Sequence, residues 1–128
     1  MKHDGLADTF NIIKFTESIG RKECLVPSSK LTEGVLRVIK NNGYISGYEP
    51  VSGVKGKKFR VFLNGMINDC NVVRPRFSMA KNEMTKWEKK FLPADNIGTL
   101  LLTTPMGITD QREAKKSGTG GKILGYIY

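Results

Sequence analysis

The fold is decided by residues 27–63, PSSKLTEGVLRVIKNNGYISGYEPVSGVKGKKFRVFL, in which a helical pattern precedes two strand patterns. Ser28 or Ser29 can begin the helix, because a hydroxyl oxygen at that place accepts a hydrogen bond from the first helical turn. Helical spacing places four apolar side chains on one face, namely Leu31, Val35, Val38 and Ile39. Asn42-Gly43 ends the helix.

Two strands are expected after this helix, at residues 44–51 and 57–63, around a turn at residues 52–56 that contains glycine. In the second strand the apolar side chains are Phe59, Val61 and Leu63. They alternate with Lys58 and Arg60, so that one face of the strand is apolar and the other is basic. These two cations are therefore expected on the solvent side, where a phosphate could reach them.

A helix and a short strand are expected before this unit. Asp4 can cap a helix whose apolar positions are Leu6, Phe10 and Ile13, and Gly20 is a suitable end for it. Residues 23–26 resemble a strand that ends at Pro27. The first part of the chain therefore reads α-β-α-β-β.

The remaining sequence is richer in strand patterns. Strands are expected at residues 66–73, 98–103 and 122–128. Helices are expected at residues 81–91, with Met84, Trp87 and Phe91 buried, and from a cap at Thr109 to Ser117, before a glycine-rich loop at residues 117–121.

These elements predict an α+β fold of two small packed domains, with segregated helices and strands. The N-terminal α-β-α-β-β half is expected at residues 1–65, and a C-terminal β-rich half with short helices at residues 66–128. Asn64-Gly65 breaks the strand pattern, which is why the boundary is placed there.

Positive charge dominates the chain. Its 128 residues include 21 Lys and Arg against 12 Asp and Glu, a net charge of +9. Residues 50–82 are the most biased segment, with seven bases and Asp69 as the only acid. A solvated surface would explain such a segment, and so would a surface that binds a polyanion such as RNA. A membrane surface is disfavoured, because neither a basic amphipathic helix nor a lipidation motif is visible.

The sequence offers little for catalysis or metal binding. His3 is the only histidine, and with Cys24 and Cys70 it makes three scattered ligands, fewer than a structural zinc site needs. The two cysteines are expected to be reduced and packed as small apolar residues, although a disulfide stays open. A remote alternative is a small enzyme that uses Cys24, whose neighbours Arg21 and Lys22 could lower the pKa of a thiol.

Residues 103–109, TTPMGIT, join an expected strand to an expected helix. Ordinary turn and cap chemistry accounts for their hydroxyls, proline and glycine. They also suit a surface for close approach, because short hydroxyl side chains and exposed backbone N–H groups reach 2′-hydroxyls and phosphates in a shallow RNA groove. Both interpretations remain open at this point.

Several motifs in order resemble a known family over nearly the whole chain. In the C-terminal half they are Leu102-Thr103-Thr104, Gly107-Ile108, Glu113-Ala114 and Gly120-Gly121-Lys122-Ile123-Leu124-Gly125-Tyr126. In the N-terminal half they are Asp4-x-Leu6-Ala7-Asp8, Pro27-x-Ser29-Lys30 and Gly43-Tyr44-Ile45. Together they resemble the universal family of small-ribosomal-subunit protein number eight. Arg74-Pro75-Arg76-Phe77, Trp87-Glu88 and Leu92-Pro93-Ala94 are similar to its archaeal and eukaryotic branch.

The resemblance implies a structural protein of the small ribosomal subunit that binds the central domain of its rRNA early in assembly. It implies rRNA and neighbouring ribosomal proteins as partners, a cytoplasmic location on the ribosome, and no cofactor or enzymatic activity. An RNA-binding regulator off the ribosome, acting on its own mRNA as some family members do, is the alternative. Membranes are not expected partners.

The expected RNA-binding residues come from two sources. The resemblance carries over the loop Thr103, Thr104, Pro105, Met106 and Gly107, the pair Ser29 and Lys30, and the turn Gly120, Gly121 and Lys122. The charge pattern adds Lys58, Arg60, Arg74 and Arg76. Two positions depart from the family: Pro105 stands where serine is frequent, and Lys122 where many bacterial members have glutamate.

Overall fold

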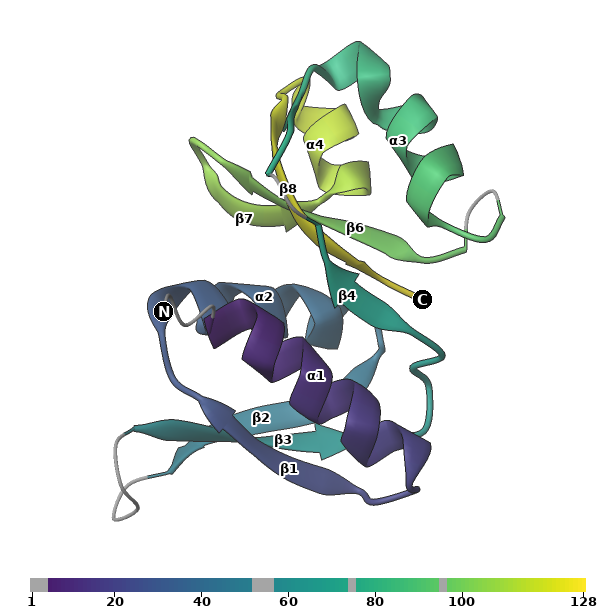
Figure 1. Cartoon of the computed structure of the whole chain (residues 1–128). Helices are drawn as coiled ribbons and strands as arrows, with labels where there is room; N and C mark the ends of the chain where they lie inside the picture. The colour runs from purple at the N-terminus through teal and green to yellow at the C-terminus, as the bar shows by residue number, and fades with distance from the viewer. Residues whose placement is uncertain (1–4, 52–56, 74–75, 95–96) are drawn as a thin grey trace.

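The computed structural model describes residues 5–51, 57–73, 76–94 and 97–128. Asp4 and His3 lie outside these residues, as do the expected turn at 52–56 and the predicted site residue Arg74 with its neighbour Pro75. The described residues form an α+β fold with two antiparallel sheets. Figure 1 shows them as alternating layers of sheet and helix.

The first layer is a three-stranded sheet, in the order β1 (Glu23–Pro27), β3 (Lys58–Leu63) and β2 (Ile45–Val51). Helices α1 (Gly5–Ser18) and α2 (Lys30–Asn41) cover one face of it (Figure 1). The predicted apolar face of α1 is confirmed, since Leu6, Phe10 and Ile13 are buried. The alternation in β3 is confirmed too, because Phe59, Val61 and Leu63 enter the core that these helices cover.

The second sheet lies on the other side of the two helices. It follows the order β4 (Cys70–Val72), β8 (Gly121–Ile127), β6 (Thr99–Thr104) and β7 (Gly107–Asp110), with β5 (Ser78–Met79) also paired to β8. Its lower face contributes Leu101, Leu124 and Ile127 to the core around α1 and α2. Its upper face packs a second core against α3 (Met84–Phe91), which follows η1 (Lys81–Glu83), and against α4 (Gln111–Ser117).

The C-terminal half differs from expectation in its local connections. Residues 103–110 do not lead directly from a strand to a helix, because β7 folds back on β6 as a hairpin. Asp110, not Thr109, caps α4, since its carboxylate accepts a hydrogen bond from the backbone N–H of Glu113 (2.8 Å). The strand expected at 66–73 covers only residues 70–72, and the two-residue strand β5 was not expected.

The aromatic residues of α3 are also less buried than predicted. Met84 is fully buried as expected, but Trp87 and Phe91 are only half-buried and stack in parallel on other rings. A lone tryptophan at helical spacing fits a core position, and the sequence pattern does not reveal that its neighbours are surface aromatics.

Candidate nucleic-acid interface

The hairpin between β6 and β7 has a two-residue turn, Pro105-Met106, with Thr104 paired to Gly107. The Thr104 hydroxyl donates a hydrogen bond to the carbonyl of Gly107 (2.8 Å) and accepts one from the N–H of Met106 (3.1 Å). Gly107 has φ = 119°, a backbone conformation that side chains other than glycine rarely adopt. The two hydrogen bonds of Thr104 and the backbone conformation of Gly107 therefore fix the shape of the turn. Met106, within the turn, is 86% exposed.

A row of polar side chains crosses the sheet next to this turn. Thr103 of β6 pairs with Lys122 of β8, which pairs with Ser78 of β5. Directly opposed residues in antiparallel strands share one face of the sheet, so a hydroxyl, an ammonium and a second hydroxyl lie side by side. Ser78 and Lys122 are exposed, and Thr103 is half-buried. We call these three residues the polar row; Ser78 was not predicted, because β5 was not expected.

The same row continues into the contact that joins the two halves of the molecule. Ile108 is the partner of Thr103 on β7, and its side chain packs on α2 at Gly34. A Cβ placed on Gly34 would lie only 2.5 Å from Cδ1 and 3.2 Å from Cβ of Ile108, so a side chain at this position would force Ile108 to shift. The helix whose first turn carries the predicted Lys30 is thereby held against the hairpin.

The far end of α2 is tied to the same segment by polar contacts. The side-chain amide of Asn42 donates to the carboxylate of Asp110 (3.0 Å), and the guanidinium of Arg112 donates to the Asn42 side-chain oxygen (3.2 Å). Arg112 also donates to the backbone carbonyl of Gly98 (3.2 Å). Together with the Ile108 contact, these bonds position α2 at two points along its length.

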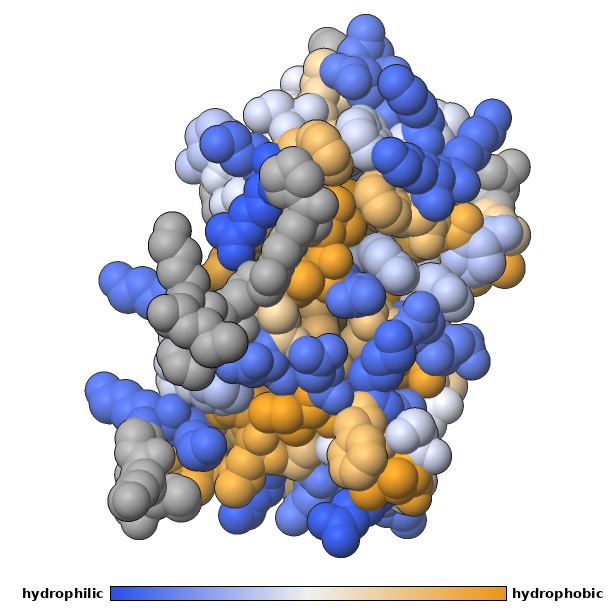
Figure 2. Space-filling model, viewed as in Figure 1, coloured by the Kyte–Doolittle hydropathy of each residue, from blue (hydrophilic) through white to orange (hydrophobic). Residues whose placement is uncertain are grey.

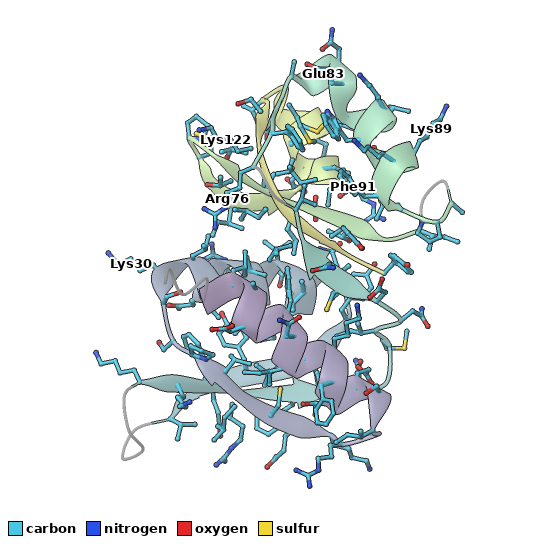
Figure 3. The ribbon with its side chains drawn as sticks, in the orientation of Figure 1. Lys30, Arg76, Glu83, Lys89, Phe91 and Lys122 are labelled. Carbon is cyan, nitrogen blue, oxygen red and sulfur yellow. The ribbon has the colours of Figure 1, made fainter. Side chains whose placement is uncertain are left out.

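The first residues of α2 face the same side as the polar row. Ser29 caps the helix: its hydroxyl accepts a hydrogen bond from the Thr32 N–H (3.0 Å) and donates one to the Thr32 hydroxyl (2.9 Å). Lys30 follows as an exposed residue. In Figure 3 Lys30, Arg76 and Lys122 lie along one side of the molecule, whereas Lys89 lies on the opposite side.

Gly120 and Gly121 allow three backbones to meet beside the polar row. A Cβ on Gly121 would lie 2.7 Å from the carbonyl oxygen of Thr103, and one on Gly120 would collide with the carbonyl of Met79. The residues expected at this turn are therefore required for the close packing of β5, β6 and β8. Lys122, which follows them, projects from this packed corner as an exposed cation.

Two predicted residues lie elsewhere on the molecule. Lys58 and Arg60 occupy the face of β3 that points away from α1 and α2, and the guanidinium of Arg60 is 3.3 Å from the Glu49 carboxylate. The three-stranded sheet and its helices therefore separate this face from the polar row (Figure 1). Arg76, by contrast, is exposed immediately before β5.

The face of the molecule seen in Figure 2 carries hydrophilic residues over much of its surface, with hydrophobic residues between them. In the part of the chain that the structure describes, no group of three or more His, Cys, Asp or Glu side chains could hold a metal ion. Among the same residues, no helix has the length and apolar character needed to cross a membrane.

The cysteines are both free. Burial raises the pKa of the half-buried Cys24 thiol, while a hydrogen bond with Thr16 lowers that pKa to a smaller extent. Burial also raises the pKa of Cys70 to about 12. A thiol whose pKa is raised carries less of the reactive thiolate near neutral pH, which is the opposite of what a nucleophile requires.

Comparison with known proteins agrees with the expected resemblance. The family model described as "Ribosomal protein S8" matches residues 4–128. The chain is 44% identical to the small ribosomal subunit protein uS8 of Methanococcoides burtonii, with 98% of this chain and 97% of that protein covered. It is 43% identical to uS8 of Archaeoglobus fulgidus and 40% identical to uS8 of Thermoplasma volcanium, both over 100% of each chain.

The fold and these relatives define a structural protein of the small ribosomal subunit. The chain belongs to the ribosomal protein S8 family. Its similarity to archaeal members also confirms the branch that the sequence motifs indicated.

Proposed function

We propose that the protein binds the central domain of small-subunit rRNA and stabilises its fold during assembly of the subunit in the cytoplasm. The observation that supports this most directly is the arrangement of one side of the molecule. The fixed hairpin turn, the polar row and the start of α2 are held together there by the contact between Gly34 and Ile108. We also expect neighbouring small-subunit proteins as partners.

This surface suits RNA recognition by shape. Lys30, Arg76 and Lys122 are exposed cations that can neutralise phosphates, which releases condensed counterions. The hairpin offers backbone groups, and the polar row offers hydroxyls, to the 2′-hydroxyls and sugar edges of a shallow groove. The Thr104 hydroxyl already uses its hydrogen on Gly107, so its role is to fix the turn rather than to donate to a base.

Titration of the full-length protein with a transcript of the rRNA central domain tests the proposal. We expect tighter binding to this transcript than to an unrelated duplex of equal length. The logarithm of the affinity should fall with the logarithm of salt concentration by roughly 0.7–0.9 for each phosphate neutralised, taking slopes measured for DNA as a guide. Equal affinity for both RNAs, or an affinity that salt does not change, would contradict the proposal.

The alternative of a regulator acting off the ribosome uses the same kind of surface on a different RNA. Co-sedimentation separates the two functions, because a structural constituent stays with the small subunit after washing in moderate salt. Competition between the rRNA transcript and the protein's own mRNA then shows whether the same surface also binds the message. A protein found only in the subunit-free fraction would favour the regulator.

A further inference from the structure

Five aromatic rings from three separate segments form a continuous array on the upper part of the molecule. In order they are Phe77, Trp87, Phe91, Tyr126 and Tyr128, which we call the aromatic ladder. Neighbouring ring centroids are 5.3–6.0 Å apart, and neighbouring planes differ by no more than 23°. The aromatic ladder joins α3 to β8. None of its five residues belongs to the RNA-binding surface proposed above.

Phe77 is the end of the ladder, and it is the most open to solvent. It stacks on Trp87 at 5.3 Å, and 37% of its surface is exposed. Its backbone is fixed, because its carbonyl accepts a hydrogen bond from the N–H of Ile123 (3.0 Å). The buried side chain of Met79, two residues further on, anchors β5, the short strand that directly follows Phe77. The Phe77 ring is thus a rigid aromatic surface that is partly uncovered.

The position of Phe77 connects it to the proposed RNA surface. It directly precedes Ser78 of the polar row and directly follows the exposed Arg76. Successive side chains of an extended strand point to opposite faces, so Phe77 lies on the opposite face from Ser78, about 3.3 Å before it along the chain. Among the described residues, β5 pairs only with β8, so the other side of β5 is an edge of the sheet. At this edge the face that carries Ser78 adjoins the face that carries Phe77.

The charges around the ring favour a nucleic acid over an apolar peptide. The ammonium of Lys90 is 6.0 Å from the centroid of Phe77 and 5.1 Å from that of Trp87. Lys122, the partner of Ser78, is exposed on the other face of the sheet, and Arg76 is exposed directly before Phe77. An aromatic face flanked by cations is the combination with which proteins bind unpaired nucleotides, the base by stacking and the phosphates by charge.

We propose that Phe77 is a stacking platform for an unpaired nucleobase of the bound RNA, with Trp87, on which Phe77 stacks, holding the ring in place. This inference rests on the proposed function, because the base belongs to an RNA strand whose phosphates contact Arg76 and Lys122. It adds a contact with a base to a surface that otherwise recognises backbone and shape.

Trp87 provides the readout, since it is the only tryptophan of the chain and stacks directly on Phe77. Full-length protein is titrated with a hexa-adenylate and with an abasic ribose-phosphate oligomer of the same length, and Trp87 fluorescence is recorded. Both ligands carry equal charge, and only the first carries bases. We expect hexa-adenylate to change the fluorescence and to bind roughly five- to a hundredfold more tightly, the range that stacking of one base provides.

Three variants assign the effect to the ring. Phe77→Leu should abolish the preference for hexa-adenylate over the abasic oligomer, and Phe77→Tyr should retain it. Phe91→Leu removes the ring on the other side of Trp87 and should also retain the preference. Circular dichroism and urea unfolding of each variant show that the comparison concerns folded protein.

The inference and the proposed function can fail separately. If wild-type protein does not distinguish the two oligomers, or if Phe77→Leu distinguishes them as well as wild type, the platform is wrong. Binding of the central-domain transcript, measured in parallel, then still decides the proposed function. If Phe77→Leu leaves RNA binding intact but weakens retention of a protein neighbour in reconstituted subunits, the ring is a protein contact and the inference is overturned.

Discussion

Ile108 of β7 packs against the backbone of α2 at Gly34, where an added Cβ would lie 2.5 Å from Cδ1 and 3.2 Å from Cβ of the isoleucine. This contact sets the distance between the hairpin and the beginning of α2. The two parts of the proposed RNA surface, a hairpin of the second sheet and the start of a helix, belong to different halves of the chain. Their common geometry therefore depends on this contact together with the hydrogen bonds that join Asn42 to Asp110 and Arg112.

Gly34→Ala should weaken both stability and RNA binding. Alanine favours a helix by about 1 kcal/mol over glycine, whereas overpacking costs about 1–3 kcal/mol. We expect a net loss of about 1 kcal/mol in the free energy of urea unfolding, because the branch point of Ile108 must move as well as its tip. Affinity for the central-domain transcript should fall too.

A second substitution tests whether the clash is the cause. Ile108→Val removes the nearest atom, so Gly34→Ala/Ile108→Val should lose less stability and affinity than the sum of the two single variants predicts. Strict additivity would show that the two residues do not act through their contact. Gly43→Ala is not a suitable control, since Gly43 has φ = 83° and its substitution is strained for a different reason.

Thr104 should act through the shape of the turn. Thr104→Val keeps the size of the side chain but removes both hydrogen bonds to the turn, each worth about 0.5–1.5 kcal/mol. We expect affinity for the central-domain transcript to fall by roughly three- to tenfold, with little change for an unrelated duplex. Thr104→Ser keeps the hydroxyl and should bind like wild type. Equal losses of affinity for both RNAs would remove the hairpin from specific recognition.

The sequence predicts the α1–β1–α2–β2–β3 part of the fold well because its signals are local. Apolar residues recur at helical spacing in α1 and α2, Ser29 caps α2 as expected, and β3 alternates in burial. The C-terminal half is harder, since its short strands exist through pairing. β5 has two residues and β7 four, and neither carries enough alternation to be recognised without β8 and β6.

The candidate site shows the same limit. The resemblance identifies the hairpin, Ser29-Lys30 and the glycine turn, and the structure brings these segments to one side of the molecule. The resemblance could not indicate that Ser78 lies beside Lys122 or that Gly34 contacts Ile108, because both relationships follow from tertiary packing. Charge bias alone did not separate Lys58 and Arg60 from the cations beside the polar row. The division at residue 65 stays a prediction.

Stability should decrease at alkaline pH through the cluster around Asp69. Burial raises the pKa of Cys70 from its ordinary value of 9.0 to about 12, and burial also raises the pKa of Tyr126. A hydrogen bond to Asp69, which lies 2.7 Å away, raises the pKa of Lys14. Each group holds its proton more tightly when folded, so its contribution is complete below its unfolded pKa and is lost as the pH rises through the folded value.

Urea unfolding between pH 7 and 11 measures this effect. We expect a constant midpoint up to about pH 8.5 and a decline above it, with one proton contributing at most about 1.4 kcal/mol per pH unit. Cys70→Ala removes the thiol's share and should give a shallower decline from a lower starting stability, because it leaves a small cavity. A midpoint that stays constant to pH 11 would contradict the assignment.

The raised pKa of Cys24 makes a quantitative test of the remote enzyme alternative possible. Because burial outweighs the hydrogen bond with Thr16, the thiol should react more slowly with a small alkylating reagent at pH 7.5 than a free model thiol does. Labelling of the Cys70→Ala variant isolates Cys24. A rate above that of the model thiol would revive the nucleophile hypothesis, and Arg21→Ala would then show whether the adjacent charge activates it.

Removal of single cations should map the RNA surface. Lys122→Ala and Lys30→Ala each delete an exposed ammonium on the proposed side, and each should lower affinity for the central-domain transcript and reduce its salt slope by about 1. Lys89→Ala is the matched control, because Lys89 is also exposed but lies on the opposite side of the molecule (Figure 3). It should leave the slope unchanged.

Arg60→Ala tests whether RNA binds the outer face of the three-stranded sheet or the side of the molecule that carries Lys30 and Lys122. Its guanidinium lies beside the Glu49 carboxylate on the outer face of the three-stranded sheet, so its charge is already partly compensated. We expect its loss to change the salt slope less than the loss of Lys122 does. A larger effect for Arg60 or Lys89 than for Lys122 and Lys30 would place the RNA on a different face and would leave the contact between Gly34 and Ile108 without a role in binding.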